Sequence, residues 1–583
     1  MKHIIHLLFL WLFFSLQTTY TQSTLSGNIA LPTDETLILQ WQERENSQQN
    51  KGIHTFVGYY QNQFVATLVI HPNKEASGSL QWEGTTYQLT GTPQGELSAK
   101  VRFHHNPNNK CGTSLQSSQT ARPITSLTSI MPNDPEGILY LYRLAVLIDY
   151  HDFANTFSSD IKQVKDFLLN LEVFLNEVYV RDIGVKFSIV ADDRLIIQEA
   201  TKQLYDQTSR RDIIENSTEK INELIGDRQY DLGIVIAPGT DSTLSGLAFF
   251  SGGFRLIRKG GASAIADNAT IAHEIGHLFG GRHTFGSHKD STAYDSEKTE
   301  LGSGTSVMSY GSPRDFFSLS SIERIRQRLT QVPAKAQDKT FATQAPRIDR
   351  SKLKNHYTIP KGTFFQFYIP ATDPDSNVLL YAVNQHDVRN GAETPITQYA
   401  IYKPTTANPV TIKTEYHENS GNVVANSGLA HQTTGTFTFW LGVSDAQPQQ
   451  AADYIVQYDL AETKVTVKEG TPFEITTTPK NKYKGGEKIS LQWKVDATIF
   501  AGTKVRVLLS DDLGKTFKHI VLAETANDGA EEITLPNINT SKAVLKVEVI
   551  EGVAFALTDY NPKTGGFTIE KDNNLVPEPL AFV

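Results

Sequence analysis

The stretch from residue 273 to residue 283 constrains this chain most, and it reads His-Glu-Ile-Gly-His-Leu-Phe-Gly-Gly-Arg-His. Because an α-helix repeats every 3.6 residues, His273 and His277 project from the same helix face. Glu274 projects beside them, placed to hold a proton rather than a metal ion. Gly280 adopts a positive φ without a Cβ clash, so the helix can end there and the chain can bring His283 back.

Three imidazoles at this spacing are typical of a catalytic zinc site. Structural zinc has four protein ligands, whereas catalytic zinc usually has three and an open fourth position. The sequence therefore predicts one zinc ion held by His273, His277 and His283. The short form H-E-x-x-H also occurs by chance on amphipathic helices, but the extended form fixes five residues and is far more specific.

A methionine follows the third histidine. Met308 lies in the segment Thr-Ser-Val-Met-Ser-Tyr-Gly, and the chain has only three methionines. Together with the extended histidine motif, this segment resembles the metzincin zinc endopeptidases, which carry a Met-turn beneath the metal. The resemblance is closest to the reprolysin-like (adamalysin-type) branch found in secreted bacterial proteins. The alternative is that Met308 fills a gap in the core.

The resemblance implies a secreted zinc metalloendopeptidase that hydrolyses peptide bonds in proteins or peptides. Zinc would lower the pKa of its bound water to about 7, and Glu274 would act as general base and then as proton donor to the leaving amine. Tyr310 stands where astacins and serralysins have a tyrosine that binds zinc or steadies the transition state. Typical animal reprolysins lack this tyrosine, so a packed aromatic ring is the alternative.

The expected fold of residues 137–335 is α/β with a mixed twisted sheet. Buried strands are expected at 142–148, 185–190 and 231–237, and helices at 161–178 and 213–225, the first capped by Ser158 or Ser159. By resemblance, Gly246, Leu247 and Ala248 belong to the edge strand that pairs with an extended substrate. An ordinary core strand is the alternative.

The N-terminal part has the features of a targeting segment followed by a propeptide. Residues 1–21 fit a signal peptide, because the apolar run from residue 4 to residue 16 is too short to span a bilayer. Residues 22–136 are predicted to form a β-rich propeptide that ends in a polar linker. This arrangement predicts export to the medium or the cell surface.

Cys111 is the only cysteine of the chain and lies in a polar Asn-Asn-Lys-Cys-Gly-Thr segment. A thiolate is a good zinc ligand and would fill the open fourth position. This resembles the cysteine switch of reprolysin and matrixin propeptides and predicts a latent zymogen, activated by removal of residues up to about 130. The alternative is a small buried residue. With one cysteine there is no intramolecular disulfide, which favours a bacterial over a eukaryotic secretory route.

The C-terminal third predicts two β-sandwich modules, so that the whole chain is multidomain α+β. The first, residues 345–468, resembles Ig- or cadherin-like repeats, and the second, residues 472–570, resembles Ig or fibronectin domains. Residues 571–583 form a tail. Asp373, Asp375 and Asp445 are candidate calcium ligands, although the first two more simply form a turn.

Charge gives no argument for nucleic acid, because Lys and Arg number 54 against 63 Asp and Glu, a net charge of -9. No segment after residue 21 is apolar enough to predict a membrane span. The alternative function is a catalytically silent scaffold that binds a surface through its C-terminal modules. We consider the peptidase the better reading, because the motif is complete.

Overall fold

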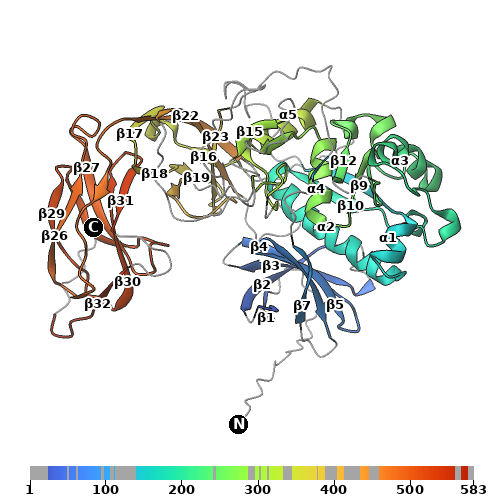
Figure 1. Cartoon of the computed structure of the whole chain (residues 1–583), viewed down its shortest axis with the longest axis horizontal. Helices are drawn as coiled ribbons and strands as arrows, with labels where there is room; N and C mark the ends of the chain where they lie inside the picture. Colours follow the sequence, from blue (N-terminus) through green and yellow to red (C-terminus); the bar gives the residue numbers. More distant parts are fainter. Residues whose placement is uncertain are drawn as a thin grey trace, which may run out of the picture.

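The computed structural model describes most of the chain, in stretches separated by gaps. The described residues are 24–33, 35–46, 48, 51–60, 63–92, 97–104, 110–111, 139–240, 244–285, 296–300, 304–311, 314–331, 344–376, 378–387, 403–412, 434–445, 458–558 and 566–575. The predicted signal peptide, the linker after Cys111 and most of the predicted tail lie outside them. The chain is multidomain, with many β-sheets and a few helices (Figure 1).

The N-terminal region is a closed barrel of seven strands. The strands are β1 (Thr24–Ala30), β2 (Thr36–Arg44), β3 (His54–Tyr60), β4 (Gln63–Ile70), β5 (Ala76–Trp82), β6 (Thr85–Gly91) and β7 (Leu97–His104). Successive strands pair antiparallel, and a parallel contact between Ala30 and Ser98 closes the barrel. Its interior holds apolar side chains such as Leu39, Trp41 and Leu89.

The central region is a six-stranded sheet with the order β10-β9-β11-β13-β12-β8. The strands are β8 (Lys110–Cys111), β9 (Tyr140–Ile148), β10 (Val185–Ile189), β11 (Leu232–Ile236), β12 (Leu244–Ala248) and β13 (Ala262–Ala264). Strands β10, β9, β11 and β13 run parallel, β12 runs antiparallel to β13, and β8 is parallel to β12. The sheet is therefore mixed. Its outermost strand comes from the segment that contains Cys111.

Helices flank this sheet. They are α1 (Tyr150–Asn155), α2 (Ile161–Ile183), α3 (Arg210–Ile225), α4 (Asn268–Leu278) and α5 (Leu319–Gln331), with short 3-10 helices at Asp193–Leu195, Ala200–Lys202, Gly252–Phe254 and Leu256–Arg258. A further 3-10 helix, Arg350–Lys352, belongs to the C-terminal region. Helix α2 ends at Gly184, whose φ of 76° suits a residue without a Cβ. The hydroxyl of Tyr179 on α2 donates to the carbonyl of Ala272 on α4, 2.6 Å away, and links the two helices.

The predicted cap of α2 is wrong. Its N-cap is Asp160, whose carboxylate accepts from the Lys162 amide at 2.8 Å. Ser158 and Ser159 lie two and one residues too early, in a left-handed turn with φ values of 54° and 58°. An N-cap residue needs extended backbone geometry, which Asp160 has and the two serines lack.

The C-terminal region consists of β-sheets that share one hydrophobic cluster. Its strands are β16 (Arg347–Ile348), β17 (His356–Pro360), β18 (Phe364–Phe367), β19 (Ala371–Thr372), β20 (Leu380–Gln385), β21 (Val410–Thr411), β22 (Gly435–Ser444), β23 (Tyr458–Lys468), β24 (Glu474–Ile475), β25 (Lys482–Lys484), β26 (Lys488–Lys494), β27 (Lys504–Ser510), β28 (His519–Ala526), β29 (Ala530–Thr534), β30 (Thr540–Val549), β31 (Ala554–Leu557) and β32 (Phe567–Glu570). Strand β18 pairs with β31, so a strand of the first predicted module extends a sheet of the second. The sequence pattern did not anticipate this shared sheet.

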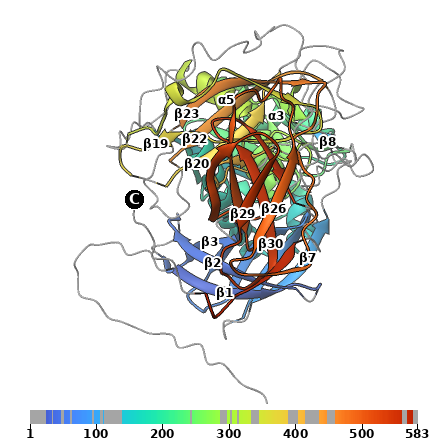
Figure 2. The ribbon, with the colours of Figure 1, turned by 90° about the vertical axis from the view of Figure 1, so that its left-hand side faces the viewer.

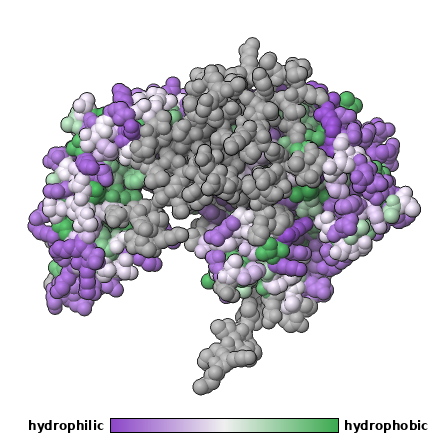
Figure 3. Space-filling model, viewed as in Figure 1, coloured by the Kyte–Doolittle hydropathy of each residue, from purple (hydrophilic) through white to green (hydrophobic). Residues whose placement is uncertain are grey.

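The barrel lies beneath the central region in both ribbon views (Figures 1 and 2). Strands β26 to β32 form a lobe at the left of Figure 1, whereas β20, β22 and β23 contribute to the hydrophobic cluster of the central region. Hydrophilic side chains cover the lower left of the molecule in Figure 3, around the ends of β30 and β32. None of the helices in the described parts of the chain has both the length and the apolar character to cross a membrane.

A buried charged junction joins the three regions. The Lys403 ammonium contacts the carboxylate of Asp315 and donates to the carbonyl of Phe64 on the barrel, 2.7 Å away. Both charged side chains are nearly buried, with 11% and 6% of their surface exposed. Burial lowers the pKa of Lys403, and the nearby Asp315 carboxylate opposes that shift. The pair therefore stabilises the junction only while both partners are present.

We expect Asp315→Ala to destabilise the protein by about 3–5 kcal/mol, because it leaves a buried ammonium without its counter-charge. Chemical denaturation followed by tryptophan fluorescence measures the loss. The double variant Asp315→Leu/Lys403→Met should recover most of it, because an apolar pair carries no desolvation cost. An unchanged transition in Asp315→Ala would show that this ion pair does not hold the junction.

Candidate metal centre

Helix α4 carries the first half of the histidine motif and is buried along its whole length. It begins after Asp267, whose side chain accepts from the Thr270 amide at 3.0 Å and caps the helix. Beyond its end, Gly280 has a φ of 86°, and the chain turns into strand β14 (His283–Phe285). The helix, the turn at Gly280 and the return of His283 agree with the sequence prediction.

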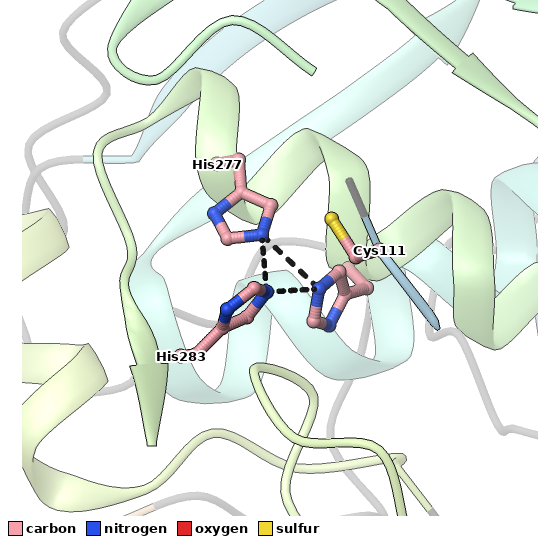
Figure 4. Close-up of side chains that lie close together, drawn as sticks. Cys111, His277 and His283 are labelled. Carbon is pink, nitrogen blue, oxygen red and sulfur yellow. Dashed lines mark hydrogen bonds between the residues drawn. The ribbon is translucent and has the colours of Figure 1, made fainter. Parts of the chain in front are cut away.

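The three histidines converge on one point (Figure 4). Their Nε2 atoms form a triangle: His273 to His277 and His277 to His283 are each 3.1 Å apart, and His273 to His283 is 3.3 Å. Each residue is 2% exposed. Ligands about 2.0–2.1 Å from one tetrahedral zinc ion lie about 3.3 Å from each other. The residues therefore fit a zinc ion held by three imidazole nitrogens.

Backbone carbonyls fix the orientation of two of these rings. Nδ1 of His273 lies 2.7 Å from the carbonyl oxygen of Val307, and Nδ1 of His277 lies 2.8 Å from that of Gly281. A carbonyl only accepts, so Nδ1 carries the proton and Nε2 presents its lone pair. Burial lowers the pKa of His273 and of His277 well below the usual value, which keeps both rings neutral. Neutral imidazole is the form that binds metal.

Met308 packs directly against the helix beneath the histidines. It is fully buried, and a Cβ built on Gly276 of α4 would lie only 2.4 Å from its sulfur. A side chain at position 276 would therefore displace Met308. The Met308 carbonyl also accepts from the amide of Thr284, 3.2 Å away and next to His283. The structure places Met308 under the histidines, where the resemblance predicts a Met-turn.

The sulfur of Cys111 lies at the same point, although Cys111 belongs to the segment that the sequence predicts to be a propeptide. Its sulfur and the three histidine nitrogens lie within 4.8 Å of one another, the only such group of metal-ligand atoms in the described parts of the chain (Figure 4). The sulfur is also 3.4 Å from Oε2 of Glu274. Strand β8, which contains Cys111, pairs with β12 at Leu244 and Gly246. Gly246, Leu247 and Ala248 thus belong to β12, the second strand from this side of the sheet, and the Cys111 segment pairs along it as the outermost strand.

Tyr310 contacts the Cys111 segment through its hydroxyl. The hydroxyl accepts from the Cys111 amide at 3.0 Å and donates to the Cys111 carbonyl at 2.9 Å. The ring lies against Phe285, with ring centres 4.4 Å apart, and near His283 at 5.2 Å. Tyr310 is thus packed among aromatic rings, as the alternative reading expected, and its hydroxyl also holds the backbone of Cys111 beside β12.

Gly246 of β12 leaves the space that Glu274 occupies. A Cβ at position 246 would lie 2.1 Å from Oε1 of Glu274. Glu274 is fully buried and points toward the sheet edge rather than joining the three ligand nitrogens. This is the geometry expected of a proton-transfer group next to a metal site rather than of a ligand.

Arg314 is a buried cation near this carboxylate that the sequence analysis missed. Its guanidinium is 3.3 Å from the carboxylate of Asp267, the cap of α4. Burial lowers the pKa of Arg314, while the carboxylates of Asp267 and Glu274 oppose the shift. A single arginine after the methionine segment carries no periodic or spacing signal, so only the fold brings it to the site.

Glu300 is a second residue that the sequence analysis missed. It ends strand β15 (Ser296–Glu300), which pairs with β14, and it is fully buried. Its carboxylate accepts from the hydroxyl of Thr284 at 2.5 Å, from the amides of Thr305 and Ser306 at 2.7 and 3.1 Å, and from the Ser306 hydroxyl. Burial raises the pKa of Glu300, and these hydrogen bonds counteract the shift. One side chain thus ties the residue after His283 to the segment before Met308.

The candidate calcium ligands do not form a metal site among the described residues. Asp373 accepts from the Asp375 amide at 2.8 Å, as in an aspartate turn, and Asp375 accepts from the Gln344 amide at 2.6 Å. Asp445 belongs to no group of metal-ligand atoms in the part of the chain described. The prediction of calcium is not supported, and the simpler reading of the first two aspartates as a turn describes their geometry.

We expect Glu300→Gln to weaken zinc binding about 10-fold, because the amide nitrogen cannot accept from the donors that surround it. Competition with a colorimetric chelator measures the affinity, and the visible spectrum of the cobalt-loaded protein reports the ligand geometry. Glu215→Gln, on an exposed part of α3, is the matched control. Equal affinity and equal spectra in both variants would show that Glu300 does not position His283.

Comparison with known proteins supports a metallopeptidase. Residues 172–284 match the family model described as metallo-peptidase family M12B, reprolysin-like. The matched stretch includes the three histidines and Glu274 and ends one residue after His283. No curated protein matches the chain.

Two solved structures with which the chain has limited similarity are immunoglobulin domains 1–5 of Sidekick-1 and the insect immune protein hemolin. Both are 10% identical with a TM-score of 0.12; they cover 40% and 41% of this chain, and the chain covers 40% and 49% of theirs. The chain thus spans less than half the length of either structure, and scores this low carry no conclusion about the modules. The family match and the cluster of three histidines and Cys111 together support a zinc-dependent metallopeptidase, a hydrolase that acts on proteins.

Proposed function

We propose that this protein is a secreted zinc endopeptidase of the metzincin type, made as a latent zymogen. The observation that carries the proposal is the triangle of three Nε2 atoms with Glu274 beside it. His273, His277 and His283 would hold the ion. When bound, zinc supplies a Lewis acid that polarises a peptide carbonyl and a water whose pKa falls to about 7.

Glu274 is the proposed proton-transfer group. Its carboxylate would accept a proton from the attacking water and deliver it to the amine that leaves. Two features support the role. The side chain is buried beside the ligand nitrogens, and it lies under the edge strand β12, where Gly246 makes room for it. An extended substrate paired with β12 would place its backbone over this carboxylate.

Tyr310 is the proposed second catalytic group. In the structure its hydroxyl both donates to and accepts from the backbone of the residue beside β12. With a substrate in that place, the same hydroxyl would donate to the carbonyl oxygen as negative charge develops on it. The rings of Phe285 and His283 would keep the phenol in position.

Latency is proposed to come from the Cys111 segment, which competes with both substrate and water. Its sulfur lies close to the three histidine nitrogens. Its backbone pairs with β12 and accepts a hydrogen bond from the hydroxyl of Tyr310. A thiolate there would fill the fourth position of the ion. Export through a signal peptide, as the N-terminal sequence predicts, belongs to the same proposal.

We expect Cys111→Ala in the full chain to hydrolyse casein, whereas the unprocessed wild type does not. Removing the sulfur frees the fourth zinc position without removing any domain. The double variant Cys111→Ala/Glu274→Ala should lose the activity, and a chelator should abolish it in the single variant. If Cys111→Ala binds zinc and still cleaves neither casein nor a mixture of peptides, the scaffold alternative gains support.

We expect Tyr310→Phe, in the Cys111→Ala background, to lower kcat about 100-fold with a small change in KM, as for loss of one donor to a developing oxyanion. Phenylalanine keeps the ring packing, so the unfolding midpoint and the zinc content should stay as in the parent. Steady-state kinetics on a fluorogenic peptide measures the split. An unchanged kcat would assign Tyr310 to packing alone.

A further inference from the structure

The barrel is covered on one outer face by the central domain. Where the outer face of a barrel meets solvent, successive residues of a strand alternate between the buried interior and the exposed outer face. Strand β2 alternates in this way over its first half, where Ile38 is 61% exposed between the buried Leu37 and Leu39. Strand β3 does not alternate, because its five central residues, 55–59, are all buried, whichever side of the wall they face. The outer face at β3 therefore packs against something other than solvent.

Helix α2 is what covers this face. Val57, Tyr59 and Phe64 of the barrel belong to the buried cluster of the central domain rather than to the barrel's own interior. Phe64 packs on Phe174 of α2 with ring centres 5.7 Å apart. Both views place the barrel directly beneath the central region (Figures 1 and 2). Separation would thus expose apolar surface on both partners, which soluble proteins avoid.

Buried polar contacts surround this apolar patch. Arg44 of β2 donates to Glu177 of α2 at 3.1 Å, and Tyr59 donates to the same carboxylate. The carboxylate of Asp166, also on α2, contacts His71 at 2.7 Å and accepts from the Ser77 hydroxyl at 2.9 Å. All of these carboxylates are at most 10% exposed. Separation would break these polar contacts and return the charged groups to water, where Asp166 would keep Lys162 of its own helix, 3.1 Å away.

These contacts lie on a different part of the molecule from the Cys111 contacts. The interface runs along α2 and is supplemented by Lys403 of the C-terminal region, which donates to the Phe64 carbonyl at 2.7 Å. The Cys111 segment contacts Tyr310, Glu274 and β12. Arg102 of β7 adds a further barrel contact, donating to the carbonyl of Ala266 at 3.0 Å. The barrel therefore has its own contacts with the central domain, and releasing the Cys111 segment does not release them.

We propose that the barrel, residues 24–104, is a retained subunit of the processed protein, which stays on α2 when the chain is cut after Cys111. This inference rests on the proposed zymogen processing, but retention itself does not require catalysis. Activation then needs only the Cys111 segment to leave the edge of β12. The retained barrel keeps that segment tethered at a high effective concentration, so cutting the linker is not sufficient for full activity.

The test uses the full chain with Glu274→Ala, to exclude self-cleavage, and with a recognition site for a specific protease inserted between residues 115 and 130. After cleavage, gel filtration at low micromolar concentration should give one peak that contains both fragments. In the same cut chain, Phe64→Ala should raise the dissociation constant of the barrel about 30-fold, the loss typical of one anchoring aromatic residue. Ile38→Ala, on the exposed face of the barrel, is the matched control and should change nothing.

Two outcomes of the binding experiment would each overturn the proposal. The first is elution of the cut wild-type barrel as a separate, folded fragment, verified by circular dichroism of each peak. The second is equal release of the barrel in the Phe64→Ala and Ile38→Ala variants, with both uncut variants unfolding at the parent temperature.

A third measurement separates retention from catalysis. With Glu274 restored, the cut Cys111→Ala chain should hydrolyse casein while the barrel still co-elutes. Co-elution without hydrolysis would contradict the proposed peptidase and leave retention intact, whereas hydrolysis that appears only after the barrel has left would overturn retention in the active form.

Discussion

The hydrogen bond from His273 to the carbonyl of Val307 is the interaction on which the centre depends most. It connects a ligand on helix α4 to the loop that carries Met308, two segments far apart in the sequence. Through Thr284 and Glu300 the same loop is also tied to the third histidine. The loop that carries Met308 therefore fixes the positions of two of the three histidines, His273 and His283. In a chain with a single cysteine, buried hydrogen bonds of this kind supply the cross-links that disulfides supply in cysteine-rich proteins.

The sequence predicted the convergence of the three histidines because its information there is local. Four-residue spacing on a helix, a glycine at the turn and a third histidine three residues later define the geometry without knowledge of the fold. The main strands and helices of the central region were predictable for a similar reason, since long apolar runs and helical periodicity are strong signals. The cap of α2 was misplaced by one or two residues, the usual error at element boundaries.

Arg314, Glu300 and the barrel interface were not predictable from the sequence. Arg314 and the barrel interface depend on contacts between segments that are distant along the chain. The partners of Glu300 lie only 5 to 16 residues away, but no repeating pattern marks it as buried. Glu300 reads as one more acidic residue in a polar stretch, yet its carboxylate accepts four hydrogen bonds in the interior. The pairing of β18 with β31 likewise crosses a boundary that the composition of the C-terminal third suggested. Hydrophobic alternation predicts a strand, but it does not identify the partner of that strand.

The single cysteine has a practical meaning beyond metal chemistry. Cys111 is the only thiol in the chain, and it lies at the mouth of the metal centre. A thiol-reactive dye therefore has a single site of reaction on this protein, and the rate of that reaction depends on how often the Cys111 segment leaves β12. The natural sequence thus contains its own labelling site, and the rate of this single reaction reports the release of the segment without any engineered residue.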